Sequence, residues 1–121
     1  MSAFSNLSDL APIQIWNGVV ARAVEGAGAT FAVMELEPDT HVPEHHHLNE
    51  QTGILLRGTM SFTIGDETKQ IEPGDMWVIP ADVPHSVVAG PDGVTLAELF
   101  TPPRADWAGF ERLPAAPVTL P

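Results

Sequence analysis

Histidines are concentrated in one short stretch of the chain. Residues 41–58 hold four of the five histidines, and the fifth, His85, follows a Pro-Ala-Asp-Val-Pro turn. In a strand, residues i and i+2 share one face and lie about 6–7 Å apart. His45 and His47 can therefore converge on one ion, while His46 points the other way. The pattern predicts a metal site in a small β-barrel.

The residues around these histidines supply a complete set of ligands. Imidazoles that converge from separate strands suit Zn, Ni, Fe, Mn, Co or Cu. The candidates are His45 and His47 on one element and His85 on another, and Glu50 or Gln51 can follow as a fourth ligand. The alternative is that the run of adjacent histidines forms a solvated loop without an ion.

Strand parity ranks the other polar residues of this stretch. Glu50 is second to Gln51 as a ligand, because its side chain has the opposite parity. His46 faces away from an ion held by its neighbours, and His41 belongs to a preceding strand or turn. For His46 and His41 we expect a supporting contact or plain exposure and no metal role.

Composition narrows the kinds of partner. The 121 residues carry a formal net charge of −11 with only five basic side chains, so nucleic acid and anionic membrane surfaces would be repelled. An anionic small-molecule substrate therefore needs a local positive centre, either a metal ion or one of Arg22, Arg57 and Arg104. The absence of cysteine excludes disulfides and thiolate ligands.

The chain length and the N-terminal segment suggest one domain in the cytoplasm. A chain of 121 residues is long enough for one core and too short for two ordinary ones. Hydrophobic content of 44% argues against disorder. The first ten residues lack the basic and apolar segments of a signal peptide, and no run approaches a membrane span of about 20 apolar residues.

Short apolar or alternating runs recur along the chain and are separated by Gly, Pro, Asn and Asp turns, which is typical of an all-β sandwich or barrel. The predicted strands are 14–16, 19–24, 30–36, 53–56, 61–64, 70–71, 76–79, 85–88 and 95–100. A short helix is expected only over 103–110, and 111–121 should be irregular. The resulting division has N-terminal strands in 13–24, a barrel core over about 28–101 and a C-terminal tail at 102–121.

Two segments carry a resemblance to a known family. The segment from His45 to Gly58 resembles the first cupin motif, His-x-His-x3/4-Glu-x6-Gly, with glutamine in place of glutamate. The segment from Gly74 to Ala89 is similar to the second motif, Gly-x5-Pro-x-Gly-x2-His-x3-Asn, but departs from it at Asp82 and Ala89. Both motifs occur in the family's order and at about its spacing.

The resemblance implies a single-domain cupin barrel over residues 1–121, with two antiparallel sheets in a jelly-roll-like arrangement. It also implies a homodimer and one divalent transition metal per subunit. His45, His47, Gln51 and His85 fall on the family's ligand positions. A neutral His3Gln set leaves the charge of the ion uncompensated, which makes a stronger Lewis acid. This favours isomerisation, cyclisation or lyase chemistry over oxygen activation.

The last predicted strand offers a carboxylate near this site. Leu96, Glu98 and Phe100 share one face of it, so Glu98 faces the barrel interior. A glutamate in that position needs a partner or a chemical task. The structural alternative is a buried ion pair with Arg57 or Arg104.

The same stretch resembles the small cupins of pectin and alginate breakdown, which convert 4,5-unsaturated monouronates to linear ketouronates. They carry Asp-x-Phe-(Ser/Thr)-Pro-Pro-Arg where this chain has Glu98, Phe100 and Arg104. The resemblance implies that Glu98 moves a proton, Arg104 pairs with a substrate carboxylate and Phe100 forms an apolar wall. The alternative for Arg104 is a structural pair with Asp106 or with a C-terminal carbonyl. Arg57 shares strand parity with the predicted glutamine ligand and can face the cavity to bind substrate, but its place just before Gly58 favours a position at the rim.

These observations predict a metal-dependent enzyme with isomerase- or lyase-type chemistry on a carboxylate- or carbonyl-bearing molecule, such as an unsaturated uronate. The enzymatic alternatives are a cupin polyketide cyclase and a cupin dioxygenase that uses Fe, Ni or Cu. A different class is a non-catalytic module that binds a sugar or another small metabolite. Oxygen consumption separates the dioxygenase from the other readings.

Overall fold

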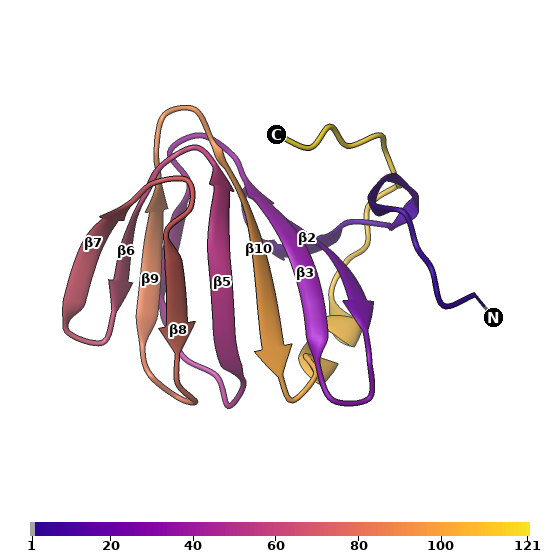
Figure 1. The fold of residues 1–121 in the computed structure, drawn as a ribbon, viewed down its shortest axis with the longest axis horizontal. Coiled ribbons are helices and arrows are strands. Elements are labelled where there is room, and N and C mark those ends of the chain that lie inside the picture. Colours follow the sequence, from indigo (N-terminus) through magenta and orange to yellow (C-terminus); the bar gives the residue numbers. More distant parts are fainter. Residues whose placement is uncertain (1) are drawn as a thin grey trace.

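Two antiparallel β-sheets form the protein, whose computed structural model describes residues 2–121 (Figure 1). The six-stranded sheet has the order β1-β2-β3-β10-β5-β8, and the four-stranded sheet has the order β4-β9-β6-β7. The strands are β1 (Ile13–Trp16), β2 (Val19–Glu25), β3 (Thr30–Leu36), β4 (His41–His45), β5 (Glu50–Arg57), β6 (Met60–Ile64), β7 (Glu67–Ile71), β8 (Met76–Ile79), β9 (His85–Ala89) and β10 (Val94–Thr101). The predicted all-β architecture is confirmed.

Alternation along the strands builds the core between the sheets. In β3, Ala32, Met34 and Leu36 are buried, whereas Phe31 between two buried neighbours is 47% exposed. The inner faces of the other strands add further apolar side chains, among them Leu55 and Phe62. A strand with one buried face needs this period of two.

The predicted strands match nine of those observed but lack β4. Pro43 and the polar residues around it hide a strand signal, because proline cannot donate to a sheet ladder. The structure accommodates Pro43 because β4 is an edge strand of the four-stranded sheet. His41 is the first residue of this strand and is exposed, so it lies in the same element as His45, not in a preceding one.

The chain outside the two sheets has little regular structure. Instead of the expected helix over 103–110, the 3-10 helix η2 (Ala105–Gly109) forms, and a second 3-10 turn, η1 (Leu7–Asp9), precedes β1. Segments near the two termini bond to each other, since Leu113 donates a backbone hydrogen bond to Pro12. Within residues 2–121, no helix has the length and hydropathy needed to cross a membrane.

Four strand ends meet at one end of the sandwich. β4 ends there at His45, β5 begins at Glu50, β9 begins at His85 and β10 ends at Thr101. This is the lower end of the sheets in Figure 1. The register places His45 opposite His85 in one sheet. The fold therefore gathers the histidine-bearing strand ends at a single opening.

The turn after β5 gives a test of the fold. Gly58 has φ +86°, and a Cβ there would lie 2.0 Å from the carbonyl oxygen of Gly93. Gly58→Ala should lower the free energy of unfolding by about 2–4 kcal/mol, because strain at positive φ adds to overpacking. Gly74→Ala is the control, with φ +95° but open space around it, and should cost about 1–2 kcal/mol. Urea denaturation measures both, and equal losses would contradict the steric argument.

Candidate metal centre

Three imidazoles converge at the open end of the sandwich. His45 ends β4, His85 begins β9 opposite it, and His47 lies in the loop between β4 and β5. One ring nitrogen from each lies within 4.8 Å of those of the other two. The convergence of His45 and His47 was predicted, but the prediction placed both residues on one strand, which is wrong. The strand ends at His45, and the loop brings His47 to the site.

Backbone carbonyls fix the orientation of all three rings. The Nδ1 atoms of His45, His47 and His85 donate to the carbonyl oxygens of Pro43 (2.8 Å), Asn49 (3.0 Å) and Val83 (2.9 Å), respectively. A neutral imidazole that donates through Nδ1 has its free lone pair on Nε2. Each acceptor lies two residues from its histidine, so the local chain selects the tautomer. Metal-binding histidines are commonly held in this way.

The Nε2 atoms of His85 and His47 have no adequate partner among residues 2–121. His85 Nε2 is buried and makes no hydrogen bond with residues 2–121. His47 Nε2 lies 3.0 Å from Gln51 Oε1. Because the hydrogen of the His47 ring is on Nδ1, both of these atoms carry lone pairs and neither can donate a hydrogen bond to the other. A cation between the imidazoles would satisfy both atoms. His45, His47 and His85 therefore form a possible site for a transition metal.

Burial keeps these imidazoles in the neutral form that a metal requires. Loss of hydration lowers the pKa of His85 to about 4. The same cause, assisted by the positive charge of Arg104, lowers the pKa values of His45 and His47. The lone pairs consequently remain available below the ordinary histidine pKa, and binding an ion need not displace three protons.

Gln51 projects its side chain into the same space. Its Oε1 faces His47, and its Nε2 donates to Glu98 Oε2. The Glu98 contact thus turns the amide so that its oxygen points towards the imidazoles. Glu50, the rival candidate, is exposed at the start of β5. The geometry allows Gln51 to complete a four-ligand set.

Glu98 is buried on the inner face of β10 and has two donors. Besides Gln51, the indole Nε1 of Trp77 donates to its Oε2 at 3.0 Å. Glu98 is therefore held by Gln51 and Trp77, and it does not form the ion pair with Arg57 or Arg104 that the sequence offered as an alternative. Burial raises the pKa of Glu98 to about 7. The side chain can therefore hold or release a proton near neutral pH.

A glycine allows the Trp77–Glu98 contact. Gly53 pairs with Glu98 on β10 and with Trp77 on β8, so the three residues form a row across adjacent strands. A Cβ at Gly53 would lie 2.5 Å from the indole. The indole can cross β5 only because this position has no side chain.

Arg104 lines the cavity next to the imidazoles. Its Nε and Nη2 donate to the two carboxylate oxygens of Asp106 at 3.0 and 2.9 Å, so the structural pairing considered above does form. The guanidinium carbon lies 4.9 Å from the ring centre of Phe100 and 4.8 Å from that of Trp107. Phe100 also contacts His47, with 5.9 Å between ring centres. Hydrogen bonding to Arg104 lowers the pKa of Asp106.

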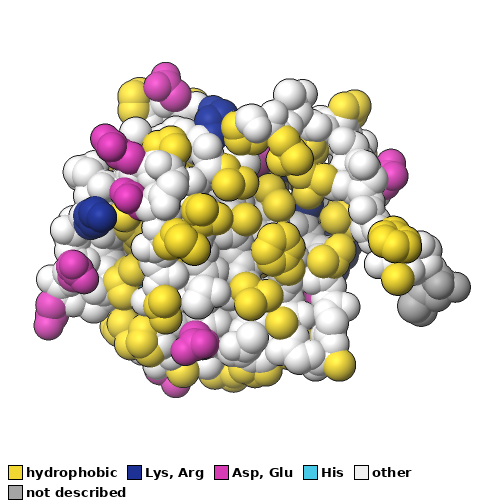
Figure 2. All heavy atoms as spheres, in the orientation of Figure 1, with side chains coloured by type: hydrophobic (Ala, Val, Ile, Leu, Met, Phe, Trp, Pro, Cys, Tyr) yellow, Lys and Arg dark blue, Asp and Glu magenta, His cyan; other side chains and the backbone are white. Residues whose placement is uncertain are grey.

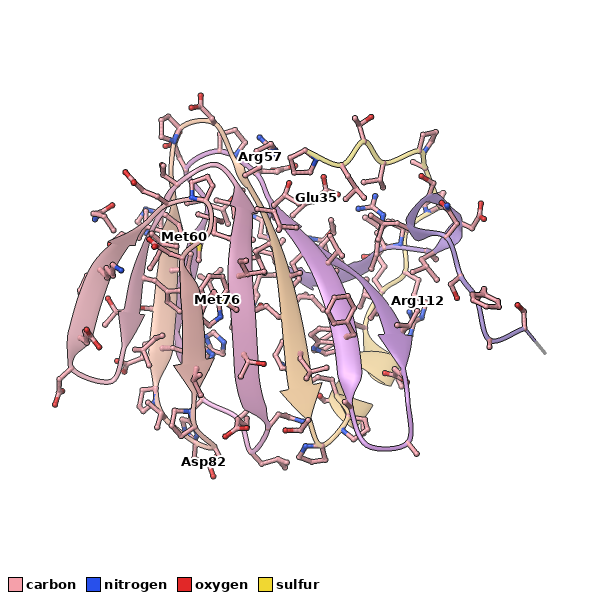
Figure 3. All side chains as sticks on the ribbon, viewed as in Figure 1. Glu35, Arg57, Met60, Met76, Asp82 and Arg112 are labelled. Carbon is pink, nitrogen blue, oxygen red and sulfur yellow. The ribbon has the colours of Figure 1, made fainter. Side chains whose placement is uncertain are left out.

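Arg57 does not face the cavity, contrary to the prediction from strand parity. The register with β10 shifts between Leu55 and Arg57, which reverses the parity of the strand beyond Leu55. Arg57 instead donates to Thr95 and to the carbonyl of Asp92. Figure 3 shows Arg57 at the opposite end of the sheets from Asp82, the residue that bonds the backbone of His47.

The departure from the second motif at Asp82 has a conformational explanation. Asp82 has φ +62°, in the left-handed region that favours glycine and that aspartate tolerates better than most residues. Its backbone N–H donates to the carbonyl of His47 at 2.8 Å. The turn therefore keeps its shape and supports the loop that carries His47.

The site opens into a cavity of about 400 Å³ between the sheets. The three imidazoles, Gln51, Glu98 and Arg104 all line it. Trp16 also lines it, with its ring 5.2 Å from that of His45. A volume of this size accommodates a small organic molecule.

The fold and the site agree with a family match. A family model described as Cupin domain matches residues 32–97, more than half of the chain. The chain belongs to the cupin family. Cupins commonly bind a transition metal and act on small molecules, in keeping with the histidine cluster.

Two curated relatives match part of this cupin. An H2HPP isomerase of Bacillus subtilis is 29% identical over 72 residues, which cover 58% of this chain and 30% of the relative. The pectin degradation protein KdgF of Dickeya dadantii strain 3937 is 28% identical over 65 residues, which cover 54% of this chain and 59% of the relative. The match spans less than two thirds of either relative.

Solved structures share the cupin fold over most of the chain. An RmlC-like cupin from Shewanella frigidimarina superposes with a TM-score of 0.81 at 20% identity and covers 88% of this chain and 96% of its own. KdgF from a Halomonas species superposes with a TM-score of 0.79, also at 20% identity, and the superposition covers 88% of this chain and 98% of KdgF. Likeness at this identity establishes the fold.

Removing one imidazole tests the metal centre. Zinc added to the metal-free protein at about 100 times its dissociation constant should stabilise the wild type by about 2.7 kcal/mol. His85→Ala should lose this stabilisation, whereas His46→Ala, which changes an exposed neighbour, should keep it. Thermal unfolding with and without zinc measures the effect. Equal stabilisation of all three proteins would place the ion elsewhere.

Proposed function

We propose that this cupin is a metal-dependent isomerase for a small carboxylate that carries a carbonyl or enol oxygen. The observation that supports this most is the neutral donor set, three Nε2 atoms and the Gln51 oxygen, directly beside the buried acid Glu98. We assign one divalent transition metal to His45, His47, Gln51 and His85. Bound there, the ion would polarise a substrate oxygen.

Glu98 is the proposed proton carrier. Its Oε2 is held by Gln51 and Trp77, whereas its Oε1 makes no hydrogen bond with residues 2–121. With a pKa raised by burial to about 7, Glu98 can accept a proton at one carbon of a substrate and return it at another. A carboxyl with this pKa is suited to both steps at neutral pH. This proton transfer moves a double bond without an oxidant.

Arg104 is the proposed carboxylate anchor. Asp106 engages Nε and Nη2, which leaves Nη1 without a partner among residues 2–121. Stacking on Phe100 and Trp107 holds the plane of the guanidinium. Charge-assisted hydrogen bonds from such a group fix a carboxylate in one orientation. The substrate would then present its reacting carbons to Glu98.

The curated relatives support this class of reaction. One is named an isomerase and the other a pectin degradation protein. An unsaturated uronate and a 2-oxo acid both combine a carboxylate with an adjacent enol or carbonyl oxygen, so both are candidates. Isomerisation of either substrate requires neither oxygen nor a redox cofactor.

Substitution of Glu98 tests the proposed chemistry. The zinc-loaded protein is incubated in D2O with 2-oxobutanoate, and proton NMR follows deuterium exchange at C3; ring opening of 4,5-unsaturated galacturonate is followed in parallel. Glu98→Gln should slow the reaction by about 10²–10⁴-fold because the proton carrier is lost. Arg57→Lys, outside the cavity, should react like the wild type.

Metal content of each variant is the control for Glu98→Gln, since Glu98 also holds Gln51. Equal zinc content with slower exchange supports proton transfer by Glu98. Equal rates for wild type and Glu98→Gln on both substrates would contradict the proposed role. Oxygen uptake coupled to turnover would instead favour the dioxygenase.

We also propose a homodimer that forms through the outer face of the six-stranded sheet. Two rows of uncharged side chains cross this face, and Figure 2 shows the apolar groups gathered there. The rows contain Val24, Phe31, Leu99, Thr52 and Val78, and then Val33, Ala97, Ile54 and Met76. Met76 is 74% exposed and Val78 is 60% exposed. Exposed apolar side chains that adjoin one another in this way support an interface here.

The distribution of charge supports a second copy as the occupant. The chain has a net charge of −11, so two copies repel each other wherever acidic groups would meet. The two apolar rows contain no acidic side chain. At one edge of them, Arg22 is already paired with Glu35. Two copies can therefore approach through this face without opposing carboxylates.

A charge placed in the centre of this face tests the dimer. Leu99→Glu should convert the dimer to a monomer, because burying an unpaired carboxylate is unfavourable. Leu120→Glu alters another exposed apolar residue, in the C-terminal tail, and should leave the dimer intact. Light scattering after size exclusion gives the masses. A monomeric wild type, or a dimer in Leu99→Glu, would contradict the proposal.

A further inference from the structure

The cavity continues beyond the imidazoles into a second layer of inward-facing residues. On the four-stranded sheet, the pair His45–His85 is followed by Val42–Val87, and Phe62 pairs with Val87 from the other side. These three side chains line the cavity. The first layer away from the imidazoles is therefore apolar on this sheet.

The opposite sheet continues the same layer. On β10, Glu98 is followed inward by Leu96, which pairs with Met34 on β3. Both side chains line the cavity. We call the space bordered by Met34, Val42, Phe62, Val87 and Leu96 the inner chamber.

The inner chamber offers no side-chain hydrogen bond. The polar side chains that line the cavity belong to the imidazole layer or to the mouth, where His46 and Asp106 are exposed. The indole of Trp107, whose buried nitrogen makes no hydrogen bond with residues 2–121, packs against Phe100 and Arg104 and therefore lies on the mouth side as well. The backbone N–H and C=O groups of the chamber strands lie in the plane of the sheets, along the ladders that join neighbouring strands, and do not point into the chamber. A hydroxyl group placed in the chamber would lose its hydration without finding a partner.

The polar anchors lie on the mouth side of this chamber. Arg104 follows the end of β10 and is clamped by the exposed Asp106, whereas Leu96 lies further inside on the same strand. A molecule whose carboxylate meets Arg104 and whose oxygen meets the imidazole layer must extend its remaining atoms into the chamber. Those atoms should be hydrocarbon.

We propose that the substrate is a 2-oxo acid, or its enol form, with a compact branched or cyclic hydrocarbon tail that occupies the inner chamber. A polyhydroxylated sugar acid does not fit this chemistry, because its hydroxyl groups would face Val42, Val87 and Leu96. The inference rests on the proposed isomerase function for the orientation of the carboxylate. It narrows the substrate class among those that the imidazole site allows.

Calorimetric titration of the zinc-loaded protein tests the tail directly. The probes are pyruvate, 4-methyl-2-oxopentanoate and D-glucuronate. Each buried methylene contributes roughly a factor of four in affinity, so the branched acid should bind at least about ten-fold more tightly than pyruvate. D-glucuronate should bind no more tightly than pyruvate. A smaller advantage for the branched acid, or tighter binding of glucuronate, overturns the inference.

A substitution that fills the inner chamber tests the same inference from the side of the protein. Val87→Phe places a ring in the chamber and should reduce the affinity ratio of the branched acid to pyruvate to below about three, since the tail loses its burial. Val88→Phe is the control, because Val88 is 40% exposed on the other face of β9, and should keep the wild-type ratio. An unchanged ratio in Val87→Phe would place the tail elsewhere.

The outcomes separate this inference from the proposed function. Tight binding of the branched acid without C3 exchange of any 2-oxo acid supports the chamber and contradicts the isomerase. Turnover of 4,5-unsaturated galacturonate without an affinity advantage for the branched acid supports the isomerase and overturns the hydrocarbon substrate.

Discussion

Three hydrogen bonds from imidazole Nδ1 atoms to nearby carbonyls are the constraint on which the site depends. They turn the Nε2 lone pairs of His45, His47 and His85 towards one point. The fold brings the histidines together, but without these bonds the rings could rotate and present either nitrogen. Because each acceptor is two residues away in sequence, the same local backbone sets both the position and the tautomer of its ring.

Gln51 links this constraint to the buried acid. In the cupin motif a glutamate stands at this position, whereas here the amide faces the imidazoles and the negative charge lies on Glu98, one contact further away. Trp77 reaches Glu98 only because Gly53 leaves room for its indole. The arrangement keeps the proposed proton carrier, Glu98, beside the proposed metal ligands without making it one of them. Such a separation suits Lewis-acid chemistry combined with proton transfer.

Periodicity and turn residues were sufficient to predict most of the fold, because most strands have one buried face and end at a turn that contains Gly, Pro, Asn or Asp. They failed at β4, where an edge position tolerates Pro43, and at Arg57, where a register shift reverses strand parity. The positions of the histidines and of Gln51 followed from motif spacing. The contact between Trp77 and Glu98 could not be predicted, because it depends on three strands that meet only in the folded protein.

The measurement that tests the central claim most directly is anomalous diffraction from crystals of the zinc-loaded protein. The account predicts one ion per chain at about 2.0–2.1 Å from the Nε2 atoms of His45, His47 and His85, with the Gln51 oxygen at about 2.0–2.2 Å. An ion bound through Nδ1 would contradict it, because the backbone carbonyls would then have lost their donors. An ion held at His41, His46 or Glu50 instead would also contradict it.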